Sequence, residues 1–271
     1  MEKKPPNTRL DNPSTEPSQL RFVAIYSMSR YGFIDGNGKP VIDAKFDEAF
    51  PFSEGLAAVR AKDFPKNWGF IDGDGQWVIK PQYGYVGSFH EGLAAVRDPS
   101  GKWGVIDKSG KWIGRPTFDG IREFSEGRAK FSVWEDGTPV RMGIIDRIGR
   151  IVAKPEFEYE AIISPFSEGL TPMKSKGKVG YLDRSGKWAI TPQFEKAFGF
   201  SEGLAQAVKD GRWGYIDTQG HSVIRPQYTT AREFKDGWAL VFVKGRAAYI
   251  DKKGDIVWRS NEDYHPPDSA G

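Results

Sequence analysis

The sequence predicts an all-β protein made of short antiparallel strands. Three observations support this fold class: 32 glycines and 18 prolines among 271 residues, an aromatic content of 14%, and one sequence unit that recurs along most of the chain. Frequent turn residues together with many aromatic residues are typical of all-β chains. We therefore expect a tandem antiparallel repeat that forms a seven-bladed β-propeller. The alternative is an open β-solenoid, a stack of β-meanders.

The first landmark of the repeat is an aromatic residue followed by glycine, two further apolar residues and aspartate. Trp68-Gly69-Phe70-Ile71-Asp72 is a complete copy, and successive copies lie 34 to 39 residues apart. The second position of the seven copies is a glycine, or an alanine in the last: Gly32, Gly69, Gly104, Gly143, Gly180, Gly214 and Ala248. We expect the glycine either to let an aromatic ring lie across the backbone or to permit a β-bulge.

Each landmark ends in Asp-x-x-Gly, as from Asp72 to Gly75. Aspartate at the first position and glycine at the fourth favour a type I turn closed by a left-handed glycine. The landmark is therefore predicted to be a strand, and the aliphatic run after the turn its antiparallel partner. That run often contains Ile-x-Pro, as in Ile79-Lys80-Pro81. Because proline donates no ladder hydrogen bond, we expect it at the end of an outermost strand.

The other half of the unit carries Phe-x-Glu-Gly followed by small aliphatic residues, as in Phe89-His90-Glu91-Gly92-Leu93-Ala94. We expect Leu-Ala-Ala-Val to form a short strand, and one more short strand between Tyr83 and Phe89. The expected role of the acid is to cap a turn, because a residue needed once for catalysis would not be repeated six times. The six acids are Glu54, Glu91, Glu126, Glu168, Glu202 and Asp236.

These landmarks, in this fixed order, resemble the WG-repeat (KWG-repeat) family of bacterial proteins. The resemblance covers residues 21–258 and implies a repeat architecture but little biochemistry. Met142, Val179 and Ala247 stand where other copies have the aromatic residue. This departure weakens any role of the tryptophan as a repeated functional site.

The sequence divides into three predicted segments. Residues 1–20 are expected to be a disordered, polar, proline-rich leader, residues 21–258 the repeat domain with partial first and last units, and residues 259–271 a tail. Residues 21–28 would supply a strand, and residues 261–264 would complete the first unit around a ring. We find neither a signal peptide nor about 18 consecutive apolar residues, and so expect no membrane span and a cytoplasmic location. A secreted chain that had lost its signal would look the same.

Composition argues against several classes of function. There are 39 Lys and Arg residues against 36 Asp and Glu, so the net charge of +3 does not indicate a nucleic-acid partner. The absence of cysteine excludes disulfides, thiolate metal sites and cysteine nucleophiles. With three histidines and no catalytic motif, we expect a protein that is not an enzyme, with no catalytic residues, no cofactor and no bound metal.

If the repeated residues are architecture, only departures from the repeat can be specific. The longest spacing contains residues 132–141, predicted to be an elongated turn that exposes Trp134 and Arg141; a Trp134 packed on its own repeat is the alternative. His90 replaces the usual serine, and Phe64 lies in a smaller extension. Because Trp and Arg are favoured contact residues, the predicted partner-binding residues are Trp134, Arg141, His90 and Phe64.

The expected function is that of a non-enzymatic repeat scaffold, which binds another protein through loops on one face. The alternative is a glycan or cell-envelope binding module, because nine tryptophans and ten tyrosines could stack on sugar rings. We expect the chain to be a monomer, with no nucleic acid among its partners.

Overall fold

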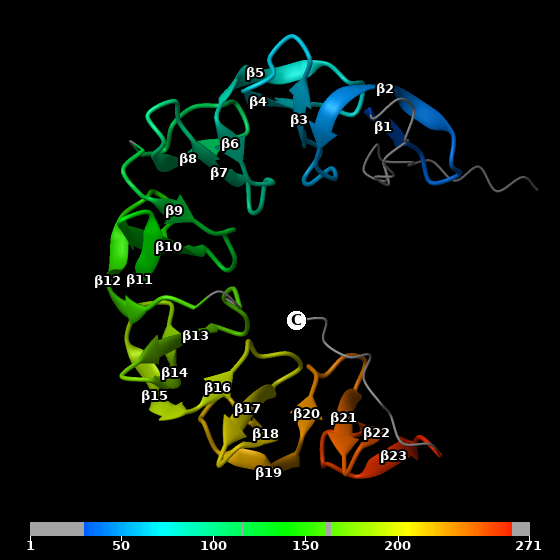
Figure 1. Ribbon diagram of the computed structural model, residues 1–271, viewed down its shortest axis with the longest axis vertical. Helices are drawn as coiled ribbons and strands as arrows, with labels where there is room; N and C mark the ends of the chain where they lie inside the picture. The colour runs from blue at the N-terminus through cyan, green and yellow to red at the C-terminus, as the bar shows by residue number, and fades with distance from the viewer. Residues whose placement is uncertain (1–29, 115, 161–163, 262–271) are drawn as a thin grey trace, which may run out of the picture. The chain divides into compact units, whose positions relative to one another are not determined.

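A computed structural model describes residues 30–114, 116–160 and 164–261, which consist of strands, turns and irregular segments without a helix (Figure 1). The all-β, antiparallel fold class is confirmed. The strand expected at residues 21–28, and residues 262–264 of the segment expected to complete the first unit, lie outside the described residues. The chain divides into two compact units, Met1–Phe89 and His90–Gly271.

The strands fall into four classes by their place in the repeat, as predicted. The landmark forms β1 (Tyr31–Ile34), β4 (Trp68–Ile71), β8 (Trp103–Asp107), β11 (Thr138–Asp146), β14 (Lys178–Asp183), β18 (Arg212–Ile216) and β22 (Arg246–Ile250). The run after the Asp-x-x-Gly turn forms β2 (Pro40–Ala49), β5 (Trp77–Tyr83), β12 (Ile151–Glu158), β15 (Trp188–Phe194), β19 (Ser222–Tyr228) and β23 (Ile256–Arg259). The run after Phe-x-Glu-Gly forms β3 (Ala57–Ala61), β7 (Leu93–Arg97), β10 (Arg128–Glu135), β13 (Leu170–Ser175), β17 (Ala205–Lys209) and β21 (Ala239–Val243). Two-residue strands are β6 (Tyr85–Val86), β9 (Gly120–Ile121), β16 (Lys196–Ala197) and β20 (Thr230–Ala231).

The Asp-x-x-Gly turns have the predicted geometry. Gly75 donates its N–H to the Asp72 carbonyl at 3.0 Å, and its φ is +75°. The Asp72 Oδ1 accepts from the backbone N–H groups of Asp74 and Gln76 at 3.1 and 2.9 Å. All seven copies make the same bonds. The landmark aspartates are therefore committed to turns.

The proline strand contains a bulge that explains the landmark glycine. Trp68 pairs with Tyr83 and Phe70 with Ile79, so the bulge leaves Pro81 in the middle of β5 rather than at its end. The other half of the prediction is confirmed, because β5 is the outermost strand of its sheet. A Cβ on Gly69 would lie 2.5 Å from the Ile79 carbonyl oxygen, so only glycine fits.

The last copy supports this explanation. Ala248 replaces the glycine there, and β23 has no Ile-x-Pro. Ala248 pairs with Arg259 and Tyr249 with Trp258 in consecutive register, so no bulge approaches the alanine. The glycine is thus present where the facing strand bulges and is lost where it does not.

The Phe-x-Glu-Gly segments form tight two-residue turns. Glu126 and Gly127 have φ of +52° and +75°, and Ser125 and Arg128 exchange backbone hydrogen bonds of 2.9 and 3.1 Å around them. Positive φ at both central residues identifies a type I′ turn, whose twist matches that of the flanking strands.

In the unit His90–Gly271, the glutamate of four such turns caps the corresponding turn of the following repeat. Its carboxylate accepts a hydrogen bond from the next turn's glycine N–H at 2.8 to 3.1 Å. The pairs are Glu91 with Gly127, Glu126 with Gly169, Glu168 with Gly203, and Glu202 with Gly237. The expectation that these acids cap turns is confirmed, and the sequence did not show that the capped turn belongs to the neighbour.

Replacing Glu126 with alanine should lower the free energy of unfolding by about 1–2 kcal/mol, because Gly169 loses its acceptor and Arg184 its ion pair at 2.8 Å. Chemical denaturation measures this loss. Exposed Glu233 offers a matched control, and Glu233→Ala should change stability by less than about 0.5 kcal/mol. Equal losses in the two variants would contradict the capping role.

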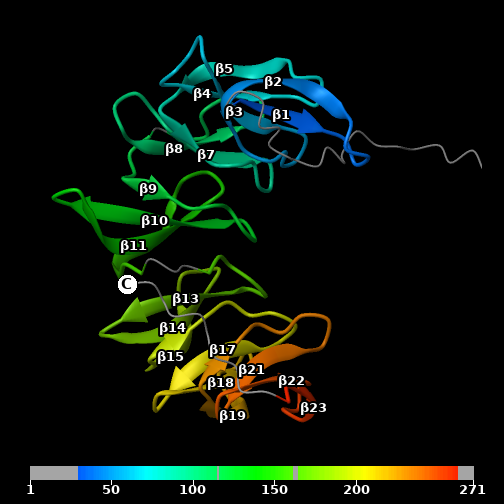
Figure 2. The ribbon, with the colours of Figure 1, turned by 45° about the vertical axis from the view of Figure 1, so that its right-hand side comes forward.

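Apolar side chains of adjacent repeats form the cores. Within His90–Gly271, Tyr215, Ile224 and Tyr228 of one repeat pack with Val241 and Ile250 of the next, and the repeats follow one another in chain order (Figures 1 and 2). The Tyr215 hydroxyl donates to the Arg232 carbonyl at 2.7 Å across the same contact. Adjacent repeats therefore bury apolar faces against each other, as in other repeat proteins.

Candidate functional site

The most irregular segment of the repeat is the hairpin of β10 and β11. The sequence predicted an elongated turn here; instead the two strands are longer and a tight two-residue turn, Asp136-Gly137, joins them. Both turn residues have positive φ, 49° and 77°, which an Asp-Gly pair readily adopts. The extra residues therefore extend a rigid hairpin.

Trp134 lies near the tip of this hairpin and is 46% exposed. Its indole N–H donates to the Ser132 hydroxyl at 2.9 Å, and its backbone N–H donates to the Asp119 carboxylate at 2.9 Å. Lys102 pairs with the other oxygen of Asp119 at 2.5 Å. The ring is thus held in place by its own hairpin while much of its surface remains open, which combines the two alternatives for Trp134.

Arg141 is exposed on the opposite face of the same hairpin. It pairs across the ladder with Val133, whereas Trp134 bonds to Ser132, and successive residues of a strand alternate between faces. The structure therefore brings Trp134 and Arg141 to one hairpin but not to one surface.

The two other predicted residues lie elsewhere in the fold. His90 is half-buried in its type I′ turn, with Nε2 at 3.7 Å from a carboxylate oxygen of Glu123. Phe64 is exposed in the unit Met1–Phe89, where its ring makes an edge contact with Trp77 at 6.5 Å between centroids. Each of them belongs to a different repeat from that of Trp134.

Lys130 was not among the residues predicted from the sequence. It lies on β10, on the face that carries Ser132, and it is only 4% exposed. Its Nζ donates to the Pro172 carbonyl of the following repeat at 2.7 Å. Burial lowers the pKa of Lys130 to about 7, and the Glu160 carboxylate opposes that shift.

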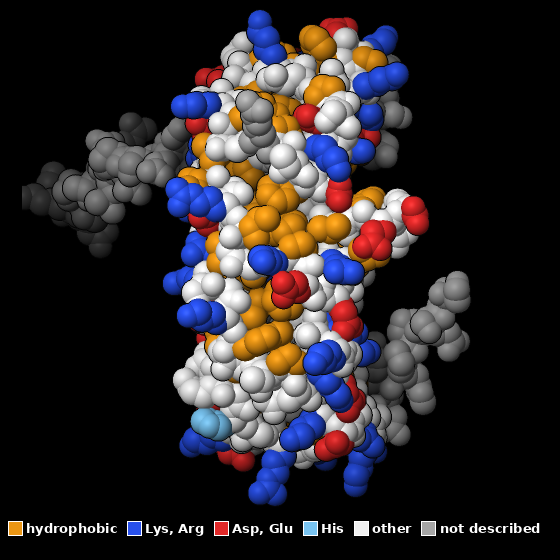
Figure 3. All heavy atoms as spheres, turned by 90° about the vertical axis from the view of Figure 1, so that its left-hand side faces the viewer, with side chains coloured by type: hydrophobic (Ala, Val, Ile, Leu, Met, Phe, Trp, Pro, Cys, Tyr) orange, Lys and Arg blue, Asp and Glu red, His pale blue; other side chains and the backbone are white. Residues whose placement is uncertain are grey.

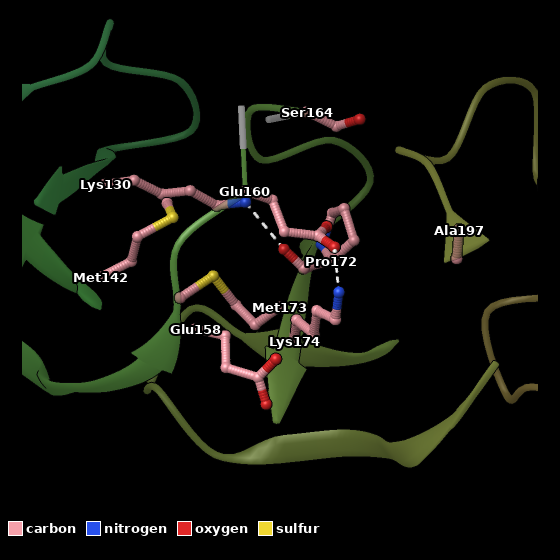
Figure 4. Close-up of a pocket in the computed structure, with 9 residues that line it drawn as sticks. All are labelled: Lys130, Met142, Glu158, Glu160, Ser164, Pro172, Met173, Lys174 and Ala197. Carbon is pink, nitrogen blue, oxygen red and sulfur yellow. Dashed lines mark hydrogen bonds and ion pairs between the residues drawn. The ribbon is translucent and has the colours of Figure 1, made fainter. Parts of the chain in front are cut away.

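A small pocket opens beside Lys130 (Figure 4). Glu160 and Lys174 form an ion pair of 3.1 Å on its wall, and Ser164 lies on its far side. One signal in the sequence could have revealed this lysine. In other copies, alanine occupies the equivalent position of the Leu-Ala-Ala-Val strand, as Ala58 and Ala95 do, and a charged residue is unusual there.

The residues that replace the landmark tryptophan are core residues. Met142 and Val179 are buried, and Met142 lines the Lys130 pocket. The retained tryptophans also pack inside: Trp68 is buried, and Trp213 stacks on Phe198 at 5.7 Å. These landmark rings therefore pack within the repeats, whereas Trp134, Trp238 and Trp258 are exposed.

Within the part of the chain that the structure describes, no three His, Asp or Glu side chains are grouped so that they could hold a metal ion. No helix among the same residues is long and apolar enough to cross a membrane.

A family profile described as WG containing repeat matches six segments: residues 31–63, 68–100, 103–133, 142–178, 180–213 and 213–246. The chain belongs to this family. The match confirms the resemblance seen in the sequence and covers most of the described residues. No curated protein matches the chain in sequence.

Among solved structures, the WG-repeat chain is similar to BamB from Moraxella catarrhalis (12% identity, 77% of this chain and 71% of that one, TM-score 0.43). It is also similar to apo AztD from Citrobacter koseri (14%, 89% and 85%, TM-score 0.45). A structure titled as the eukaryotic initiation factor shares 14% identity over 89% of this chain and 76% of that one, with a TM-score of 0.51. This last likeness supports the propeller-type fold class alone, and the count of seven blades stays a prediction.

Proposed function

We propose that this WG-repeat protein is a non-enzymatic scaffold that binds another protein, with Trp134 at the centre of the contact. The observation that carries the proposal is the hairpin of β10 and β11, which departs from the repeat and exposes a tryptophan held by two hydrogen bonds. Tryptophan is favoured at the centre of protein interfaces, and a ring that is already fixed loses little entropy on binding.

The charges around Trp134 indicate the chemistry of the partner. Glu135 and Asp136 are exposed at the hairpin tip, next to the tryptophan. A complementary surface would hold an apolar pocket for the ring, with Lys or Arg at its rim. Arg141, on the opposite face, would contribute only if the partner encloses the hairpin; His90 and Phe64 are secondary candidates.

The face shown in Figure 3 also suits a protein partner. On the face shown in Figure 3, hydrophobic side chains are exposed between basic and acidic ones. Because charges of both signs are interspersed, this face carries no single-sign field of the kind that attracts nucleic acid.

Affinity capture from a lysate of the source organism tests the proposal. Wild-type protein should retain a specific partner, and Trp134→Ala should reduce its recovery at least tenfold without changing the melting temperature by more than a few degrees. Val223, exposed on β19 in another repeat, provides the control, and Val223→Ala should capture as the wild type does. Equal recovery with all three proteins would refute the role of Trp134.

A further inference from the structure

The last repeat exposes an aromatic residue at a position that the six other copies bury. At the third landmark position, six copies are at most 2% exposed: Phe33, Phe70, Val105, Ile144, Tyr181 and Tyr215. Tyr249, which occupies that position in the seventh copy, is 44% exposed. The strands β21 and β22 pair in the same register as β17 and β18, and Tyr249 keeps the cross-strand partner position that Tyr215 has, although β23 lacks the bulge of β19.

Two tryptophans of the same repeat are uncovered in the same way. Trp258 pairs with Tyr249 as Ile224 pairs with Tyr215, yet Trp258 is 52% exposed and Ile224 is buried. Trp238 follows its turn where other copies have a buried leucine, such as Leu204, and is 43% exposed. We refer to Trp238, Tyr249 and Trp258 together as the end face.

In the inner repeats, the following repeat covers these positions. A Cβ on Gly254 would lie 3.2 Å from the Ile224 side chain, so the turn of the seventh copy lies against the isoleucine of the sixth. The Phe234 ring packs on Tyr215 at 4.8 Å between centroids. The end face therefore has the residues of an inter-repeat contact, and no repeat among the described residues follows it in the chain.

The first repeat presents the other half of this contact. Ile34 is half-buried, whereas the equivalent residue is at most 4% exposed in the later copies: Ile71, Ile106, Ile145, Leu182, Ile216 and Ile250. The turn glycine Gly38 has open space around its Cβ position, as Gly149 also has, whereas Gly75 lies against Ile42 of the preceding repeat at 3.2 Å. We refer to Ile34 and the turn of Gly36 and Gly38 as the start face.

The turn-capping series is unmatched at the same two ends. Gly55 belongs to the first Phe-x-Glu-Gly turn, so no acid precedes it in the series, and Asp236 belongs to the last, so no glycine follows it. By its place in the series, Asp236 offers an acceptor beside the end face, and Gly55 offers a backbone N–H in the first repeat.

We propose that the end face of one molecule binds the start face of a second copy, head to tail. A second molecule can bring these two faces together whatever the arrangement of the two units within each molecule. The contact would repeat the inter-repeat core, with aromatic residues of the end face covered by the turn of Gly36 and Gly38. Such a contact is heterologous, so its two sides can be blocked separately.

This proposal goes beyond the scaffold function and does not rest on Trp134. It replaces the expectation of a monomer, because the sequence alone does not show which copies leave apolar side chains exposed. The three aromatic residues of the end face are large, and their burial supplies the apolar area that association requires.

Sedimentation velocity over a hundredfold range of concentration tests the proposal. Wild-type protein should associate as its concentration rises. Trp258→Glu should weaken this association at least tenfold, and so should Ile34→Glu. Each variant keeps one intact face, so an equimolar mixture of the two should form a one-to-one dimer although neither associates alone.

Controls separate this contact from folding defects and from other occupants of the end face. Gly36→Trp is the second start-face variant, to be used if Ile34→Glu fails to fold. Gly36 has ordinary φ and open space around its Cβ position, so the tryptophan should block the start face without disturbing the fold. Val223→Glu and Trp134→Ala should associate as the wild type does. Wild-type protein that stays monomeric over this concentration range would overturn the proposal. That result is expected if another part of the same molecule covers the end face. So would start-face variants that still self-associate, since the end face would then pair with itself.

Discussion

Gly214→Ala is expected to lower the free energy of unfolding by about 2–3 kcal/mol, although it adds a single methyl group. The new Cβ would lie 2.5 Å from the Ile224 carbonyl oxygen and 2.8 Å from the Pro226 nitrogen. Both atoms are backbone atoms of the bulged strand β19, so no side-chain rotation relieves the overlap. Either the bulge must open or the ladder between Trp213 and Tyr228 must break. Urea denaturation of the purified variant measures the loss.

A matched glycine distinguishes this steric effect from the general effect of removing glycine. Gly36 has ordinary φ and no atom within 4 Å of its Cβ position. Gly36→Ala should therefore be neutral or stabilise slightly, because alanine reduces the entropy of the unfolded chain. If both variants lose the same stability, the close approach of the bulge is not the reason that the landmark contains glycine.

The repeat made the strands and turns predictable from the sequence. Asp72 and Gly75 act within one hairpin, and local residue preferences determine such a turn. The strand pairing could be predicted because each landmark sits next to its partner in the chain. The exchange of Gly for Ala at residue 248 could also have been explained, since it coincides with the loss of Ile-x-Pro in the same copy.

Contacts between repeats were harder to predict, because they join residues about 35 positions apart. Glu126 was expected to cap a turn, and only the structure shows that the turn is that of Gly169. The tight turn at Asp136 was not predicted for another reason. A longer spacing between two landmarks can come either from longer strands or from a longer loop. The type I′ tendency of Asp-Gly was the signal that favoured strands.

The candidate site was predictable in part. The irregular spacing led to Trp134, but strand alternation places Arg141 on the other face, which a loop would not have done. Lys130 was missed because its surroundings come from the next repeat, including Pro172 and Glu160. A position-by-position comparison of the copies would have identified the one lysine among small and neutral residues.

Lys130 should make the stability of the protein depend on pH. Its pKa is about 7 in the folded chain and about 10.5 when unfolded, so the unfolded state holds the extra proton between these values. The stability that this group contributes is therefore complete above pH 10.5 and is lost as the pH falls toward 7. From pH 9.5 to pH 6.5 the wild type should lose about 3 kcal/mol from this group.

Lys130→Met should remove that dependence while keeping the volume of the side chain. The variant loses the donor to the Pro172 carbonyl, which costs about 1–3 kcal/mol at every pH. It also lacks the titrating amine, so relative to the wild type it should gain stability as the pH falls. Urea denaturation between pH 6.5 and 9.5 measures how the stability of each protein changes with pH. Higher pH is avoided because burial raises the pKa of Tyr215, and its titration adds an opposite slope above pH 10.

Lys174→Met, which removes a partly exposed lysine from the same pocket, should keep most of the wild-type slope. Parallel slopes for wild type and Lys130→Met would show that Lys130 stays protonated in the fold throughout this range, with its charge stabilised by Glu160.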